Sequence, residues 1–370
     1  MNGHVRKRGE TWSYVVDVGG DGPRRQKWKG GFRTKKEAER ELRRYVTRVE
    51  SGGDPFPENL TLGSYLDRWL EHQTARLRPR THQRYTQLLA EVNTAIGHLR
   101  LERVRPAHVQ AVIDAMSARG LAPRTVVQAR AVLGHAMRQA VAWGLLTTNP
   151  VQAVRPPKPD RPRLEVPTAE QLLQLVGAAE GTQWEIPLLL AATTGARRGE
   201  VLAVRWADVD LDAGRLRITR ALQRVGAELV VVDPKTPRAR RQISLPAFAL
   251  ERLRRHRREQ AERRLLVGPG WADLDLICER GDGRPLQPDS WTGAFKRIAA
   301  SAGLPAAMRL HDVRHGYATA LLAGGVHPAI ASAALGHASP GFTMSVYQHV
   351  LDEMTDQAAA AIDAAFEEFR

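Results

Sequence analysis

Residues 155–167 read RPPKPDRPRLEVP, and this stretch decides how the chain divides. Five of its thirteen residues are proline and four are basic, which predicts a stiff, exposed segment that can touch phosphate groups. A chain of 370 residues is also too long for one ordinary core. We therefore expect an interdomain linker at 155–167, with a proline-rich surface loop inside a single domain as the alternative.

The chain before this linker has the periodicity of helices. Apolar residues recur at helical spacing in four segments: after Thr61, after Thr81, over 109–116 and over 124–143. We expect Thr81 to cap the second of these helices. This pattern predicts a compact all-α domain of four helices over residues 60–154.

The first residues form a separate basic module. Residues 1–50 hold fourteen Lys and Arg against seven Asp and Glu. Trp12, Tyr14 and Val16 alternate as in a strand, and the stretch that reads QKWKGGF can add one or two more strands. A capping box at 34–37 then opens a helix. Residues 1–54 are therefore predicted to be a small β-sheet with one helix packed on it, which could enter a DNA groove.

Residues 168–370 are predicted to form an α+β domain that is mainly helical. A capping box at 168–171 opens its first helix, and the segments 215–219, 228–232 and 242–245 have strand character. These strands predict one small antiparallel sheet. The fold class expected from the sequence is thus multidomain, with a β-sheet and helix module, an all-α domain and an α+β domain.

The net charge and the cysteine content indicate which class of molecule the protein binds and in which cellular compartment it works. The net charge of +15 and the sequence pI of about 10.6 favour nucleic acid as the partner. Neither a membrane-spanning apolar run nor a signal peptide is recognisable, so we expect a cytoplasmic protein that makes no membrane contact. The single cysteine, Cys278, excludes a disulfide framework and a multi-cysteine zinc site, and we expect it to be a small buried hydrophobe.

Short fragments in the C-terminal part combine residues that can act on a phosphate ester. They are 194–200 (TGARRGE), 233–235 (DPK), 311–314 (HDVR) and 335–337 (LGH), followed by Tyr347. Each fragment alone is a weak signal, because His-x-x-Arg pairs and arginines after glycine are common on solvated helix faces. Their order along the chain is more specific and resembles that of the tyrosine recombinases, the family of lambda-type phage integrases.

The resemblance covers essentially the whole chain. It implies an arm-DNA-binding-like domain at 1–54, a core-DNA-binding domain at 60–154 and a catalytic domain at 168–370. The sequence departs from the family at Gly316, where a small hydroxyl residue is common, and at Ala196, where a larger apolar residue is common.

The family's activity is site-specific recombination through a 3′-phosphotyrosyl intermediate and a Holliday junction, which integrates or excises a phage or other mobile element. Its implied partners are double-stranded DNA attachment sites and further copies of the chain, which form a tetramer on DNA. Host or phage DNA-bending and directionality factors are further partners that the resemblance allows. It implies no metal and no cofactor, and a bacterial location on the nucleoid when DNA is bound.

The residues themselves suggest roles in phosphodiester chemistry. Arg197 and Arg314 can clamp the phosphoryl oxygens, because a guanidinium binds them in a planar fork and stays charged. His311 is the candidate base or proton partner, and Lys235 can protonate the leaving 5′ oxygen as a general acid. Glu200 follows Arg197 by three residues, so we expect a structural ion pair between them.

Tyr347 is the predicted nucleophile, since the resemblance places the family's tyrosine ten residues after Gly-His. The resemblance also implies that His337 donates a hydrogen bond to the phosphate. Tyr317 is the rival nucleophile, but Val313, Tyr317 and Leu321 recur every four residues, which predicts a place on the apolar face of a helix.

Other functions for the same sequence are a DNA-binding regulator, a relaxing topoisomerase and a metal-dependent transposase. The helix-turn-helix pattern at 320–335 motivates the first of these. The complete catalytic set argues against a regulator. A second DNA-contacting domain would let the protein bridge two DNA sites, which a relaxing topoisomerase does not require. The histidines His311, His315, His337 and His349 match no recognised zinc spacing.

The apolar pattern of residues 352–370 predicts a helix that docks on its own domain or on a neighbouring protomer.

Overall fold

The computed structural model describes residues 3–17, 26–50, 59–158, 166–233, 240–336 and residue 366. The chain splits into two compact units, Met1–Arg161 and Pro162–Arg370. The division falls inside the stretch predicted to be a linker, of which residues 159–165 lie outside the described residues. In the described part, no helix has both the length and the apolar character needed to cross a membrane.

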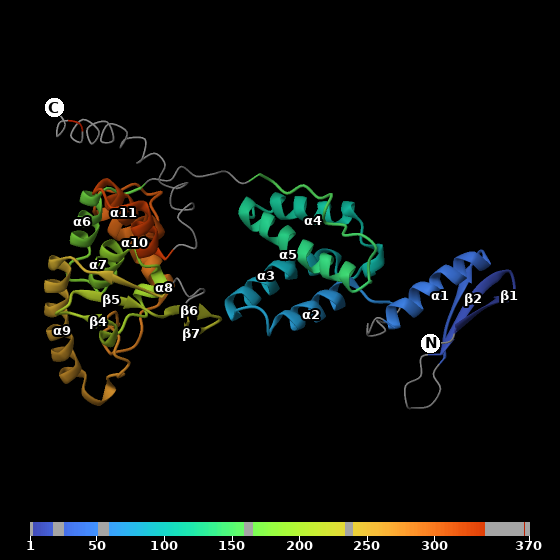
Figure 1. The fold of residues 1–370 in the computed structure, drawn as a ribbon, viewed down its shortest axis with the longest axis horizontal. Coiled ribbons are helices and arrows are strands. Elements are labelled where there is room, and N and C mark those ends of the chain that lie inside the picture. The colour runs from blue at the N-terminus through green and yellow to red at the C-terminus, as the bar shows by residue number, and fades with distance from the viewer. Residues whose placement is uncertain are drawn as a thin grey trace. The chain divides into compact units, whose positions relative to one another are not determined.

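The N-terminal part of the first unit is a small antiparallel sheet with a helix on one face (Figure 1). Tyr14 and Val16 are buried against Tyr45 of the helix, as the strand and helix patterns predicted. The first strand was not predicted, because Val5 is its one apolar residue with a clear inward position. The elements are β1 (Gly3–Arg8), β2 (Thr11–Asp17), β3 (Gln26–Phe32) and α1 (Lys35–Glu50).

The rest of the first unit is the predicted all-α domain. Trp69 is fully buried at its centre and stacks on Tyr85, with ring centroids 6.0 Å apart. The prediction that Thr81 caps the second helix is wrong: the helix starts at Pro79, with Arg78 as its N-cap. Proline suits the first helical position because its φ is preset and its missing N–H costs no bond there. The helices are α2 (Leu62–Gln73), α3 (Pro79–Ile96), α4 (Pro106–Ala118) and α5 (Pro123–Ala142).

The second unit is mainly helical, as predicted, but its described residues form two small antiparallel sheets instead of one. One sheet has the order β4-β5-β8, and β6 pairs with β7 alone. The strands β6 and β7 pair with each other because a two-residue turn joins them, and this turn begins at Gly226, with φ of 62°. The strands are β4 (Val209–Asp210), β5 (Arg215–Ile218), β6 (Ala221–Val225), β7 (Glu228–Val232) and β8 (Arg241–Ser244).

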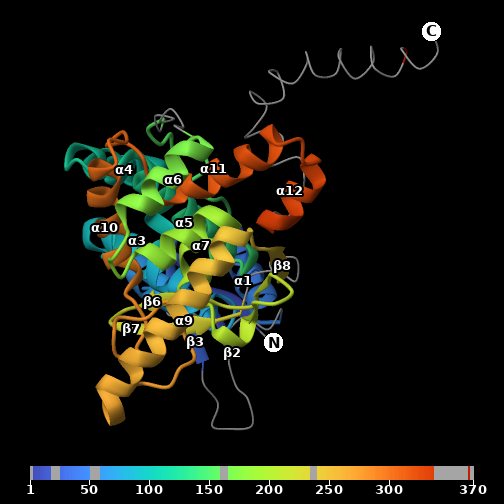
Figure 2. The ribbon, with the colours of Figure 1, turned by 90° about the vertical axis from the view of Figure 1, so that its left-hand side faces the viewer.

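Helix α7 is the central helix of the second unit. It packs against α6, α9 and α11, and Figure 2 shows it between α11 and α9. Leu188 and Leu190 are fully buried, and the apolar character all round α7 explains why it has neighbours on several sides. The helices are α6 (Ala169–Ala178), α7 (Glu185–Thr194), α8 (Arg198–Val201), α9 (Ala247–Val267), α10 (Pro288–Ser301), α11 (Leu310–Ala323) and α12 (Pro328–Leu335).

Gly316 provides a test of how α11 packs. A Cβ at this position would lie 2.7 Å from the carbonyl oxygen of Pro167 and 2.8 Å from its Cγ. We expect Gly316→Ser to lower the free energy of unfolding by about 1–3 kcal/mol, because a packed backbone must shift. Urea unfolding measures the change.

Gly293 in α10 is the matched control, since nothing lies within 4 Å of a Cβ built there. Gly293→Ala should raise stability by about 0.5–1 kcal/mol, as alanine does in place of a helical glycine. A Gly316→Ser protein as stable as the wild type would contradict the close packing of α11 on Pro167.

Candidate active site

The segment 194–200 turns the chain sharply between α7 and α8. Gly195 has a left-handed φ of 60°, and a Cβ there would overlap the ring of Tyr317. Gly199 lies against β6, where a Cβ would be 2.5 Å from the carbonyl oxygen of Leu222. Both glycines are thus required by close contacts, and Arg197 between them begins α8 as its N-cap residue.

Arg197 is oriented by Glu200. Its Nη1 lies 2.9 Å from Oε1 of Glu200, and its main-chain N–H donates to Oε2 of the same carboxylate at 2.9 Å. This confirms the predicted ion pair. Burial would raise the pKa of Glu200, but the charge and hydrogen bond of Arg241, with a contribution from Arg197, hold it below its usual value. The side chain of Arg197 is 44% exposed, so part of its guanidinium remains accessible to a ligand.

Helix α11 supplies His311 and Arg314, whose spacing places them on one face of the helix. Arg309 is the N-cap residue, and its guanidinium forms an ion pair with Asp312 at 2.8 Å. His311 lies in the first turn, where the unpaired N–H groups and the helix dipole favour an anion.

Arg314 is buried, with 4% of its surface exposed. Its Nη1 donates to the carbonyl of Gly195 at 2.7 Å, and its Nη2 donates to the carbonyl of Leu335. These bonds connect the ends of α7 and α12 to α11. A guanidinium held in this way cannot reorient, so its position is fixed before any substrate binds.

Arg197, His311 and Arg314 line one cavity of about 430 Å³. Arg198 and Arg309, which were not among the predicted site residues, line the same cavity. Their only sequence signal is that they neighbour predicted site residues, and that signal alone cannot separate a cavity wall from a solvated helix face. Among the described lining residues none is acidic, so the cavity suits an anion. Besides these arginines and His311, the lining residues are Ala191, Ala196, Gly199, Trp291, Thr292 and Leu310.

His311 and His315 lie edge to face, with ring centroids 5.1 Å apart. Burial and the charge of Arg314 lower the pKa of His311 below its usual value. Burial and the neighbouring His311 lower the pKa of His315 to about 4. Both rings are therefore neutral near pH 7, and a neutral imidazole at position 311 can accept a proton.

Lys235, His337 and Tyr347 lie outside the described residues. The segment with Lys235 leaves the described chain at Asp233 and returns at Arg240, and these two side chains form an ion pair at 3.3 Å. The segment with His337 and Tyr347 follows α12 directly. The structure therefore brings together three of the six predicted site residues.

Tyr317, the rival nucleophile, has a packing role. Its ring lies against Gly195 and the small apolar cluster between α11 and α12, which includes Leu322 and Leu335. Burial raises the pKa of its hydroxyl, which makes it a poorer nucleophile at neutral pH. The prediction that Tyr317 belongs to an apolar helix face is confirmed.

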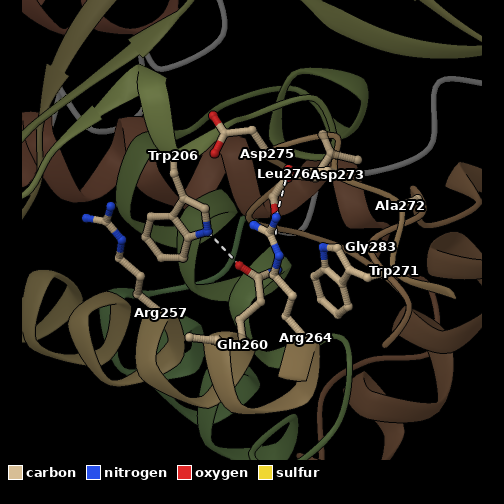
Figure 3. Close-up of a pocket in the computed structure, with 11 residues that line it drawn as sticks. Trp206, Arg257, Gln260, Arg264, Trp271, Ala272, Asp273, Asp275, Leu276 and Gly283 are labelled. Carbon is tan, nitrogen blue, oxygen red and sulfur yellow. Dashed lines mark hydrogen bonds and ion pairs between the residues drawn. The ribbon is translucent and has the colours of Figure 1, made fainter. Parts of the chain in front are cut away.

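Two other features of the second unit bear on alternative chemistry. Figure 3 shows a different pocket, where Trp206 donates to Gln260 and Arg264 pairs with Asp273. None of the predicted site residues that the structure describes lines it. Cys278 is buried and its pKa is raised by burial, so the prediction of a small buried hydrophobe is confirmed. Within the described ranges, no group of three or more His, Cys, Asp or Glu could hold a metal ion.

Models of three protein families match the chain in the order of its predicted domains. The phage integrase family matches residues 164–354, just over half of the chain. An arm DNA-binding domain matches residues 4–47, and the phage integrase central domain matches residues 63–156.

Two relatives are similar over nearly their full length. An integrase of Streptomyces ambofaciens is 27% identical and covers 98% of this chain and 95% of its own. A tyrosine recombinase XerC-like protein of Caldanaerobacter subterraneus subsp. tengcongensis is 24% identical and covers 90% of each chain.

Solved structures share the fold at low sequence identity. The Tn1549 transposon integrase, in complex with a circular intermediate DNA, has a TM-score of 0.68 at 17% identity and covers 83% of this chain and 99% of its own. A lambda integrase tetramer bound to a Holliday junction has a TM-score of 0.57 at 21% identity, over 93% of this chain and 94% of that one.

The lowered pKa of His315 predicts how stability depends on pH. Because the folded pKa of about 4 lies below that of an unfolded histidine, the unfolded chain takes up the proton first as pH falls. The free energy of unfolding should therefore decline as the pH drops from about 6.5 towards 4. Calorimetry of His315→Gln should show a smaller decline than the wild type, and an identical decline would contradict the buried, neutral imidazole.

Proposed function

Because this chain belongs to the phage integrase family, whose members are site-specific DNA recombinases, we propose that Tyr347 attacks the scissile phosphate and forms a 3′-phosphotyrosyl bond. The observation that carries the proposal is the common cavity of Arg197, His311 and Arg314, which come from two separate segments of the chain. The cavity is basic and lies at the N-terminus of α11, so it fits a phosphate group.

The chemistry exchanges one phosphoester bond for another. The hydroxyl oxygen of Tyr347 attacks phosphorus, the bond to the 5′ oxygen breaks, and the 5′ hydroxyl is released. Arg197 and Arg314 balance the charge on the phosphoryl oxygens, and removal of one such donor typically costs about a hundred- to a thousandfold in rate. His311 accepts the tyrosine proton, since its lowered pKa keeps it neutral.

Two residues complete the proposed site from the segments outside the described residues. Lys235 protonates the leaving 5′ oxygen as general acid, and His337 donates a hydrogen bond to the phosphate. Attack of the free 5′ hydroxyl on the phosphotyrosine of the partner strand reverses the step and rejoins the backbone. The phosphotyrosine retains the energy of the broken ester, so the exchange consumes no nucleotide.

The proposed cycle uses two DNA duplexes and several copies of the chain. Exchange of one pair of strands gives a Holliday junction, and exchange of the second pair resolves it. A tetramer on DNA would hold the two attachment sites, as the solved lambda integrase tetramer holds a Holliday junction. Recombination would integrate or excise a phage or other mobile element, with DNA-bending and directionality factors as further partners, in the bacterial cytoplasm and on the nucleoid.

We keep the predicted domain division as part of the proposal: 1–54 for arm-site DNA, 60–154 for core-site DNA, 155–167 as linker and 168–370 for catalysis. The three family matches support this order, since they cover residues 4–47, 63–156 and 164–354. A basic N-terminal module beside a second DNA-binding domain would let one chain hold two separate DNA sites.

A covalent trap tests the proposed nucleophile. The purified protein is incubated in EDTA with a nicked duplex that carries its attachment site, and adducts are separated on a denaturing gel. Wild type should give a protein–DNA adduct, whereas Tyr347→Phe should bind the duplex without one. Tyr317→Phe is the matched control and should give the adduct, because it keeps the ring that packs on Gly195.

Each other outcome rejects part of the proposal. An adduct from Tyr347→Phe would assign the nucleophile to another residue. Absence of an adduct from wild type on a verified site would favour a DNA-binding regulator, and cleavage only without EDTA would favour a metal-dependent enzyme.

A further inference from the structure

The last turn of α12 is held by two arginines that come from distant parts of the chain. The final carbonyl groups of a helix have no partner within the helix. Nε of Arg241 donates to the carbonyl of Ala334 at 2.6 Å, and Nη2 of Arg314 donates to the carbonyl of Leu335. Gly336 then ends the helix with φ of 65°. The chain thus enters the segment with His337 and Tyr347 from a helix end that two guanidinium groups fix.

Arg241 also contacts the residue that orients Arg197. Its Nη2 lies 2.8 Å from Oε2 of Glu200, and the two side chains are 5% and 6% exposed. The other carboxylate oxygen of Glu200 accepts from Arg197 at 2.9 Å. The attraction within a buried ion pair offsets the free-energy cost of lost hydration only when the geometry is good and further hydrogen bonds are made, as they are here. Contacts therefore run without a break from Arg197 through Glu200 and Arg241 to Ala334.

Arg241 has a third connection through the backbone. It is the first residue of β8, which pairs with β5, and it follows Lys235 by six residues. The strand that leads from the Lys235 segment is therefore tied by this one side chain to α8 and to the end of α12. A residue whose only role was to stabilise the sheet would not need to contact both.

We propose that Arg241 is a positioning residue for strand cleavage, which sets the orientation of Arg197 through Glu200 and fixes the end of α12 through Ala334. The inference rests on the proposed recombinase function and deepens it. Arginine is required because its planar fork donates from Nε and Nη2 in two fixed directions, whereas the single ammonium of lysine holds neither orientation.

Arg241→Lys is the direct test, because it keeps the charge and removes the fork. The matched control is Arg240→Lys, since Arg240 is the neighbouring residue, is 62% exposed and forms an ion pair with the surface residue Asp233. The rate of covalent adduct formation is measured at saturating DNA, and the Kd for DNA is measured separately.

We expect Arg241→Lys to form the adduct about ten- to a hundredfold more slowly, since small misplacement of catalytic groups has effects of this size. Its Kd should stay within about twofold of wild type, and Arg240→Lys should cleave at the wild-type rate. A merely structural role would lower the melting temperature or the affinity and leave the saturated rate unchanged. That result, or a normal rate in Arg241→Lys, would overturn the inference while the Tyr347 adduct of wild type still stands.

A second variant covers the case in which Arg241→Lys does not fold. The double variant Glu200→Gln with Arg241→Gln removes both charges of the buried pair, so neither of these two is left unpaired in the interior. We expect it to melt close to wild type and to form the adduct slowly. A folded double variant with the wild-type rate would overturn the inference, and a wild type without any adduct would overturn the proposed function and this inference with it.

Discussion

The buried guanidinium of Arg314 is the interaction on which the candidate site depends. A charge that is 4% exposed loses most of its hydration, and it is stable there only because strong acceptors replace water. Two of those acceptors are the carbonyls of Gly195 and Leu335, at the ends of α7 and α12. The charge therefore joins three helices at one point, and the fold itself fixes where the guanidinium stands in the cavity.

The rest of the site follows from this constraint. Gly195 must lack a Cβ because the turn after α7 brings its carbonyl to Arg314 and its Cα to the ring of Tyr317. Glu200 is buried beside the cavity and balances both Arg197 and Arg241. The carboxylate thus organises the arginines without lining the cavity, which stays basic enough to attract a phosphodiester.

The sequence predicted the parts of this arrangement that depend on local pattern. The order of the fragments and the three-residue spacing of His311 and Arg314 sufficed to select residues that share a cavity. Arg241 could not be found in this way, because its partners lie 41 and 93 residues away and only the folded chain brings them together. The division of the small sheets depends on the turn after β6, and the start of α3 depends on the preset φ of Pro79; neither follows from apolar periodicity.

If arginines in the cavity neutralise charge on the scissile phosphate, an uncharged substrate should depend on them less. Adduct formation with Arg197→Ala can be measured on two substrates, the natural phosphodiester and a duplex with an uncharged methylphosphonate at the cleavage position. Arg197 is partly exposed, so its removal leaves the buried contacts of Arg314 in place. We expect Arg197→Ala to lose about a hundredfold or more on the phosphodiester and to recover to within about tenfold of wild type on the methylphosphonate. An equal loss on both substrates would show that Arg197 does not act by neutralising the phosphate.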